Sequence, residues 1–294
     1  MRTLIQDVKT RWNSTYNMLK RFEEISSNVS IALLSINTDL SAPNYSEMQI
    51  VRDIIKILQP FLEATEKISG SSYVTSSLCI PLTTGILTKL ERLQDGDLNS
   101  VAGIHLRNAL LGRAKVRLLP YETEKLCGMA TLLDPRFKNY AFYKDVNVTP
   151  HILALQNIIR RNNRSVENES VDGSVGVRND QDLNTNASIF NFIRRRMSQR
   201  PRETDSGLAN ILSEYLHEPL ESENCNIIAF WCETDRNRIL SKVAKRQLIV
   251  PGSSVSSEQI FSSTGLLIRG HRSNISDAKI NEMTFIKNNL WLIE

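Results

Sequence analysis

The sequence lacks several features that would place it in a familiar class. It has no apolar run of about 18 residues, which a membrane-spanning helix needs, and no apolar stretch after Met1 of the kind found in secretory signals. It also has no Gly-rich phosphate loop and no Ser-His-Asp arrangement. Nothing in the sequence therefore supports secretion, membrane insertion, nucleotide binding or serine-type hydrolysis.

Cysteine and histidine are also scarce. The four cysteines show no CxxC pairing, so they do not suggest a disulfide framework, and reduced thiols in a cytosolic or nuclear protein are the simpler interpretation. His217, Cys225 and Cys232 do not have the spacing of zinc ligands. Aromatic residues make up 6% of the chain, but the hydrophobic share of 41% is enough for a substantial core. The net charge of +4 is mildly basic, which is compatible with a nucleic-acid partner.

Apolar residues recur at helical spacing through much of the chain. The pattern predicts helices over residues 11–37, 48–65, 78–93 and 98–118, and a further helix from Pro120 that ends before Pro135. Pro60 should kink or split the second of these helices. Residues 11–135 are thus expected to form an all-helical block.

Residues 160–206 have a different composition. They are rich in Asn, Ser, Asp and Arg and poor in large apolar residues, apart from the island at 189–193. Such a segment buries too little surface to offset the entropy of ordering, so we expect a disordered linker. Its basic run at 194–202 fits a nuclear-localisation or DNA-contact patch, or simply a solvated linker. Beyond it, helices are predicted near 208–216, over 227–248, around Glu258 and from Ser276 onwards.

Three segments carry unusual residue combinations. Residues 7–19 read DVKTRWNSTYNML, residues 132–138 read LLDPRFK, and residues 247–265 read QLIVPGSSVSSEQIFSSTG. They resemble, in the same order, the "DVxTRWNSTYxML", "LDPRFK" and "ATSVPSERVFS" segments of the hAT family of cut-and-paste DNA transposases and their domesticated, BED-zinc-finger relatives. Residues 240–290 resemble the dimerisation region of that family.

The resemblance implies a fold that is mostly α. It implies an incomplete ribonuclease H-like domain interrupted by a large all-helical insertion. Residues 1–12 would be the edge of the truncated ribonuclease H-like domain, and residues 13–159 the helical insertion. Residues 160–206 would be the linker, and residues 207–294 the C-terminal dimerisation region with the closing helices. The BED-type zinc finger of the family has no counterpart here, and the start at Met1 suggests a truncated copy or a partial gene model.

The resemblance also assigns chemistry. Such transposases use three carboxylates around two Mg²⁺ ions, and Glu258 matches the third of them. The other two precede the segment that begins at Asp7, so we expect no strand cleavage by this chain and no cofactor; Mg²⁺ is expected only in a full-length active relative. On physical grounds alone, the favoured explanation of Glu258 is a carboxylate that stabilises the first turn of its helix.

Two kinds of contact residues remain. Arg11 and Trp12 match the "RW" pair of the family, where the tryptophan lies near the scissile end; they are candidates for DNA binding, and Trp12 is equally well explained as a core anchor. A dimerisation surface is expected from a stripe in the terminal helix that faces a second stripe upstream. The residues of the two stripes are Ile280, Met283, Ile286, Leu290 and Trp291, and Leu240, Val243 and Leu248. The same residues would also fit packing within one chain.

Two functions follow from these expectations. The first is a nuclear, transposase-derived protein that acts by C-terminal homodimerisation, with contact to DNA and without catalysis. The alternative is a fragment of an active metal-dependent transposase whose N-terminal part is absent from the gene model. Neither implies a membrane or a small-molecule substrate.

Overall fold

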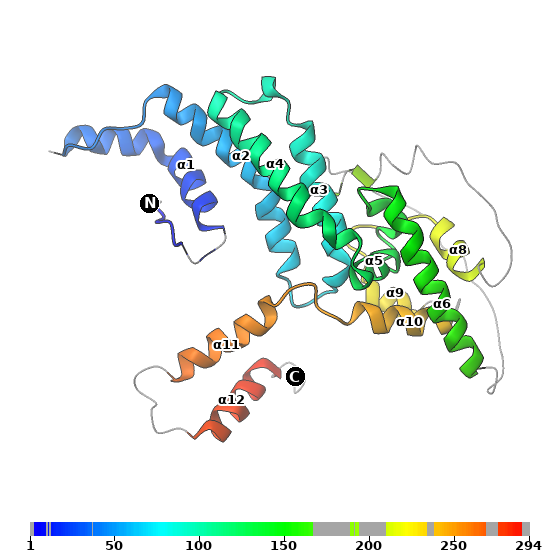
Figure 1. The fold of residues 1–294 in the computed structure, drawn as a ribbon. Coiled ribbons are helices and arrows are strands. Elements are labelled where there is room, and N and C mark those ends of the chain that lie inside the picture. The colour runs from blue at the N-terminus through cyan, green and yellow to red at the C-terminus, as the bar shows by residue number, and fades with distance from the viewer. Residues whose placement is uncertain are drawn as a thin grey trace.

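The computed structural model describes residues 3–9, 11, 13–36, 38–166, 189–190, 192–193, 210–233, 238–268 and 276–289. Within these ranges the regular structure is entirely helical (Figure 1). The expected mostly α fold is therefore confirmed. The ribonuclease H-like part is not seen, because residues 3–9 and 11 form no strand and the described ranges offer no other strand to pair with them.

The N-terminal half is a bundle of four long helices. They are α1 (Ser14–Ser35), α2 (Tyr45–Ile68), α3 (Cys79–Arg92) and α4 (Val101–Leu118), and α2 packs against each of the other three. Helix α2 begins with a capping box, in which Asn44 Oδ1 accepts from the Glu47 amide and Glu47 Oε2 accepts from the Asn44 amide. The predicted split at Pro60 is wrong, because Pro60 is buried inside one continuous helix. The surrounding packing outweighs the loss of one amide donor.

The middle of the chain contains two α-helices, α5 (Lys125–Leu132) and α6 (Val148–Val166), separated by short 3-10 turns. The helix predicted from Pro120 is divided in the structure, since Leu119–Glu122 is a 3-10 turn and α5 begins at Lys125. Helix α6 was not predicted as an element at all. It continues to Val166, which lies within the segment expected to be a linker.

The C-terminal part consists of two groups of helices. The first group is α8 (Asn210–His217), α9 (Ile227–Glu233) and α10 (Arg238–Leu248), and the second is α11 (Val255–Ile268) with α12 (Asp277–Asn289). The single helix predicted over 227–248 is thus two helices. The helix predicted around Glu258 is α11, which continues to Ile268. In Figure 1, α11 and α12 lie side by side as a hairpin that projects away from the rest of the molecule.

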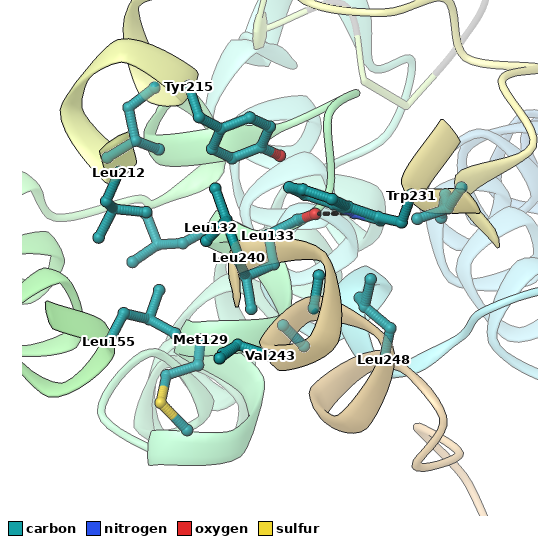
Figure 2. Packing of buried hydrophobic residues seen from close by; sticks show 14 of the residues in the cluster. Met129, Leu132, Leu133, Leu155, Leu212, Tyr215, Trp231, Leu240, Val243 and Leu248 are labelled. Atoms are coloured by element: carbon teal, nitrogen blue, oxygen red, sulfur yellow. Dashed lines mark hydrogen bonds between the residues drawn. The ribbon is translucent and has the colours of Figure 1, made fainter. Parts of the chain in front are cut away.

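Two clusters of buried apolar side chains hold the described residues together. The first joins α5 and α6 to α8, α9 and α10 (Figure 2). Tyr215 and Trp231 lie at its centre, with ring centroids 5.1 Å apart, and the Trp231 indole donates to the Leu133 carbonyl at 2.9 Å. The helices on either side of the 160–206 segment therefore form one core.

The second cluster lies among α2, α3 and α4, and it includes the apolar island. The buried island residues are Ile189, Phe190, Phe192 and Ile193. Gly85 on α3 makes room for them: a Cβ there would lie 2.8 Å from the Ile189 carbonyl oxygen. The disordered-linker prediction therefore does not hold for the island or for residues 160–166, and the rest of that segment lies outside the described residues.

Candidate assembly surface and motif sites

The N-terminal motif forms a local hydrogen-bonded cluster beside the start of α1. The Asp7 carboxylate accepts from the Ser14 hydroxyl and from the Thr15 hydroxyl, the latter at 3.1 Å. The Ser14 hydrogen bond is the main reason that the pKa of Asp7 is lowered. These contacts explain why an aspartate lies seven and eight residues before Ser14 and Thr15 in the motif. They give Asp7 a structural role.

Arg11 follows in the same turn and is exposed. It borders a surface hollow of about 340 Å³ whose other cations are Lys20 and Arg21 on α1. Trp12 lies outside the described residues. The hollow thus contains three cations and one carboxylate, that of Glu24, which pairs with Arg21 at 3.3 Å.

The second motif is buried and structural. Asp134 is fully buried and accepts from the Ser77 hydroxyl at 2.6 Å and from two nitrogens of the Arg136 guanidinium at 2.8 and 2.9 Å. Lys138 is 1% exposed, and its ammonium donates to three carbonyl oxygens at the end of α8 and just beyond. Those carbonyls belong to Tyr215, Glu218 and Pro219, at 2.6, 2.9 and 3.1 Å. The motif therefore joins the middle of the chain to its C-terminal part.

The third motif begins with a tether. The Gly252 amide donates to Thr75 Oγ1 at 2.9 Å, and the Ser253 hydroxyl donates to the Ile68 carbonyl at 3.0 Å. A Cβ at position 252 would lie 2.5 Å from the Thr75 carbonyl oxygen, so only glycine fits this contact. The Pro-Gly pair thus fixes the start of the α11–α12 hairpin to the turn after α2.

Glu258 lies in the first turn of α11 and is exposed. Its carboxylate accepts from the Ser254 hydroxyl at 2.7 Å, which fits the capping interpretation. Among the described residues, no three His, Cys, Asp or Glu side chains come together as a metal site.

Two of the remaining candidate ligands, His217 and Cys225, have local surroundings that the structure describes. The His217 ring lies 2.6 Å from the Ser213 carbonyl oxygen one turn earlier. Burial, with a contribution from Glu221, raises the pKa of Cys225 to about 11. In addition, none of the described helices combines the length and the apolar character needed to span a membrane.

The two stripes expected to form the dimer have different positions. Leu240, Val243 and Leu248 are at most 2% exposed within the first core, so their assignment to an external surface is wrong. Their spacing on an amphipathic helix fits either role, and packing against α5 and α6 is the one they adopt (Figure 2). The terminal stripe differs: Met283 and Ile286 are exposed on α12, and Ile280 is half-buried. Leu290 and Trp291 lie outside the described residues.

The hairpin carries two exposed aromatic residues that the sequence patterns did not single out. Phe261 on α11 is 75% exposed and Phe285 on α12 is 68% exposed. Their signal was present in the sequence, as large apolar residues next to Ile260 and Ile286, which are also exposed. The hairpin is held together in part by the hydroxyls of Thr264 and Thr284, 3.1 Å apart. It therefore presents exposed apolar side chains on both of its helices to solvent.

Comparison with known proteins agrees with this arrangement. The hAT family C-terminal dimerisation region matches residues 211–290, and the ZBED1 RNase-like helical domain matches residues 1–57. The chain is 23% identical over 314 residues to the putative AC transposase of Zea mays, an alignment that covers 96% of this chain and 36% of the relative.

Two human proteins are also similar. Zinc finger BED domain-containing protein 4 is 23% identical over 293 residues, which cover 99% of this chain and 24% of that protein. Zinc finger BED domain-containing protein 6 is 32% identical over 148 residues, which cover 47% of this chain and 14% of that protein. The chain spans about a third or less of the length of these relatives.

The helical fold and the matched dimerisation region are those of a transposase-related protein. The chain is a hAT transposase-related protein, similar to the zinc finger BED domain-containing proteins. Its C-terminal region is of the kind that mediates oligomerisation.

Proposed function

We propose that this chain is an assembly module, which forms a homodimer by covering the apolar face of the α11–α12 hairpin with the same face of a second copy. The observation that supports this most strongly is the exposure of Phe261 and Phe285 on a hairpin that projects from the body. The hairpin lies within the residues matched by the dimerisation region. Exposed apolar patches of this kind are typical of interfaces.

Physical arguments favour a second copy over packing within the chain. The two cores of the described residues are complete without the hairpin, since neither contains a residue of α11 or α12. A two-helix hairpin alone buries little surface, and helices in proteins depend on such burial for stability. A two-fold axis would place each apolar face on its equivalent, the commonest closed arrangement.

Light scattering on the intact chain tests this proposal. The parent protein should have the mass of a dimer, and Phe261→Glu with Phe285→Glu should be a monomer with an unchanged helical circular dichroism spectrum. Leu34→Glu with Val116→Glu is the matched control, because both residues are exposed apolar positions on helices of the body; it should remain a dimer. A monomeric parent protein, or loss of helicity in the hairpin variant, would contradict the proposal.

We further propose that the chain contacts DNA near Arg11 and Trp12 and acts in the nucleus. The cationic hollow beside Arg11 and the names of the relatives support this proposal. Arg11→Gln should weaken binding of duplex DNA, measured by fluorescence anisotropy, while Lys144→Gln at another exposed cation should not. Equal affinities of the two variants would count against it.

Finally, we propose that this chain does not cleave DNA by itself. Glu258 is the only residue that matches the family's catalytic carboxylates, and it has no acidic partners among the described residues. A nicking assay with Mg²⁺ or Mn²⁺ on terminal-repeat duplexes should give no product.

The alternative, that the sequence is part of an active transposase, draws support from the similarity to the AC transposase. A product that disappears in Glu258→Ala would favour it.

A further inference from the structure

Helix α10 has an unusual distribution of charge. Its sequence, RILSKVAKRQL, contains four cations and no carboxylate. Leu240, Val243 and Leu248 are buried in the first core, whereas Arg238, Lys242 and Arg246 are exposed and Lys245 is half-buried. At about 100° per residue, the four cations lie within an arc of roughly 100° on the side opposite the buried residues. The solvent face of α10 is therefore purely cationic.

The neighbouring helices do little to neutralise this face. Helix α10 packs against α5, α6 and α9. Helices α5 and α6 contain no aspartate or glutamate, and α9 contains one carboxylate, that of Glu233. Among the described residues, no ion pair joins Glu233 or any other carboxylate to the four α10 cations. The whole chain has 36 basic and 32 acidic residues, so its charges nearly balance. The four cations of α10 are therefore a local excess of positive charge.

We propose that the solvent face of α10 is a binding surface for the phosphate backbone of duplex DNA, separate from Arg11 and from the dimerisation hairpin. The cations extend over nine residues, from Arg238 to Arg246, a rise of about 12 Å. That length matches three to four phosphates of one strand at about 3.4 Å per phosphate along the axis. The face is held rigid by its buried side, which suits a stiff ligand with regular charges.

Other polyanions fit this face less well. Single strands are bound by combining cations with exposed aromatic side chains, and α10 contains no aromatic residue. Anionic membranes are bound by helices that insert their apolar face, and that face of α10 is buried in the core. The contacts proposed here are to phosphates, which carry no sequence information directly, so binding through this face should not depend on DNA sequence.

Anisotropy with a random-sequence 30-base-pair duplex at several salt concentrations tests the proposal. Lys242→Gln with Arg246→Gln should weaken binding and reduce the slope of log affinity against log salt by roughly 2, one unit for each phosphate that is no longer neutralised. Arg113→Gln with Arg117→Gln is the matched control: these exposed cations have the same spacing on α4 and should leave the slope unchanged. Both variants should keep the helicity and the mass of the parent protein.

The outcomes separate this surface from the hairpin and from Arg11. An equal loss of affinity in the α10 and α4 variants, or an unchanged salt slope in the α10 variant, would overturn the proposal that α10 binds DNA. The proposal would also be overturned if polyglutamate, single-stranded DNA or anionic vesicles competed as effectively as unlabelled duplex DNA. Light scattering on the same samples reports dimerisation independently, and Arg11→Gln reports the N-terminal contact.

Discussion

Replacement of Lys138 by methionine should strongly destabilise the protein. Methionine has nearly the same length and volume but no charge and no donor. The change would leave three carbonyl oxygens at the end of α8 without the ammonium that now contacts them. It would also remove a cation that lies 4.5 Å from the centre of the Tyr215 ring.

The structure sets the magnitude of this effect. Hydrogen bonds that involve a charged group contribute about 1.5–3 kcal/mol each, so three such bonds represent about 4.5–9 kcal/mol. Removing the ammonium also removes the cost of burying it, which offsets part of this loss. We expect a net decrease of about 2–4 kcal/mol in the free energy of unfolding. This is a large fraction of the roughly 5–15 kcal/mol typical of folded proteins.

Urea unfolding followed by circular dichroism measures the effect, and Lys144→Met at an exposed lysine nearby provides the control. Lys138 also has a positive φ of 49°, a conformation that glycine adopts without cost. Lys138→Gly would relieve this backbone conformation by about 1 kcal/mol. It would also leave a cavity where a fully buried side chain now packs, so it should be at least as destabilised as Lys138→Met. If Lys138→Met loses no more stability than Lys144→Met, the buried ammonium is not the structural link inferred from its three hydrogen bonds.

Three further changes test other contacts. Trp231→Phe removes the indole donor to the Leu133 carbonyl, and thermal unfolding should show a loss of about 1–3 kcal/mol; full stability would contradict a role for this hydrogen bond. Gly252→Ala places a methyl group against the Thr75 carbonyl, and thermal unfolding should show a decrease of about 1–3 kcal/mol in the free energy of unfolding. An unchanged stability would mean that the backbone around Gly252 shifts at no cost. Glu258→Gln should change stability by less than about 1 kcal/mol, because the carboxylate is exposed and its hydrogen bond to Ser254 is local, and a larger loss in denaturant titration would point to a further partner.

Much of the helical framework follows from local sequence. The apolar spacing in α2 and the Asn44–Glu47 capping box are both contained within a few residues, so α2 could be predicted despite Pro60. Helix α6 has a similarly clear apolar period, but Pro150 near its start and its Arg- and Asn-rich end resemble a loop. Proline is tolerated there because the first-turn amides of a helix have no intrahelical partner.

The remaining features depend on contacts between distant parts of the chain. The apolar island is too short to show a period, and its burial depends on the space beside Gly85, about a hundred residues earlier. Lysine is rarely fully buried, so no local pattern indicated that the Lys138 ammonium would meet carbonyls 77 to 81 residues away. The family motifs located these residues but did not reveal that the second motif is structural.

The same limit applies to the candidate site. Apolar residues recur at helical spacing in both α10 and α12, and such spacing does not tell whether a helix faces its own core or a partner. Only the three-dimensional arrangement places Leu240 and Val243 inside the molecule and Met283 and Phe285 outside it. The exposed cations of α10 became meaningful for the same reason, once the opposite face of that helix was known to be filled.

The tether at Gly252 has a mechanical consequence. Helix α10 is anchored in one core, whereas Ser253 is bonded to Ile68 at the end of α2, a helix that packs in the other core. The Gly252 amide is bonded to Thr75 in the turn that follows α2. A pull or rotation applied to the hairpin by a bound second copy would therefore be transmitted to both cores at a single short segment. The region matched as the dimerisation region is not a detachable unit, because excising residues 211–290 would strip α8, α9 and α10 of the surfaces that cover them.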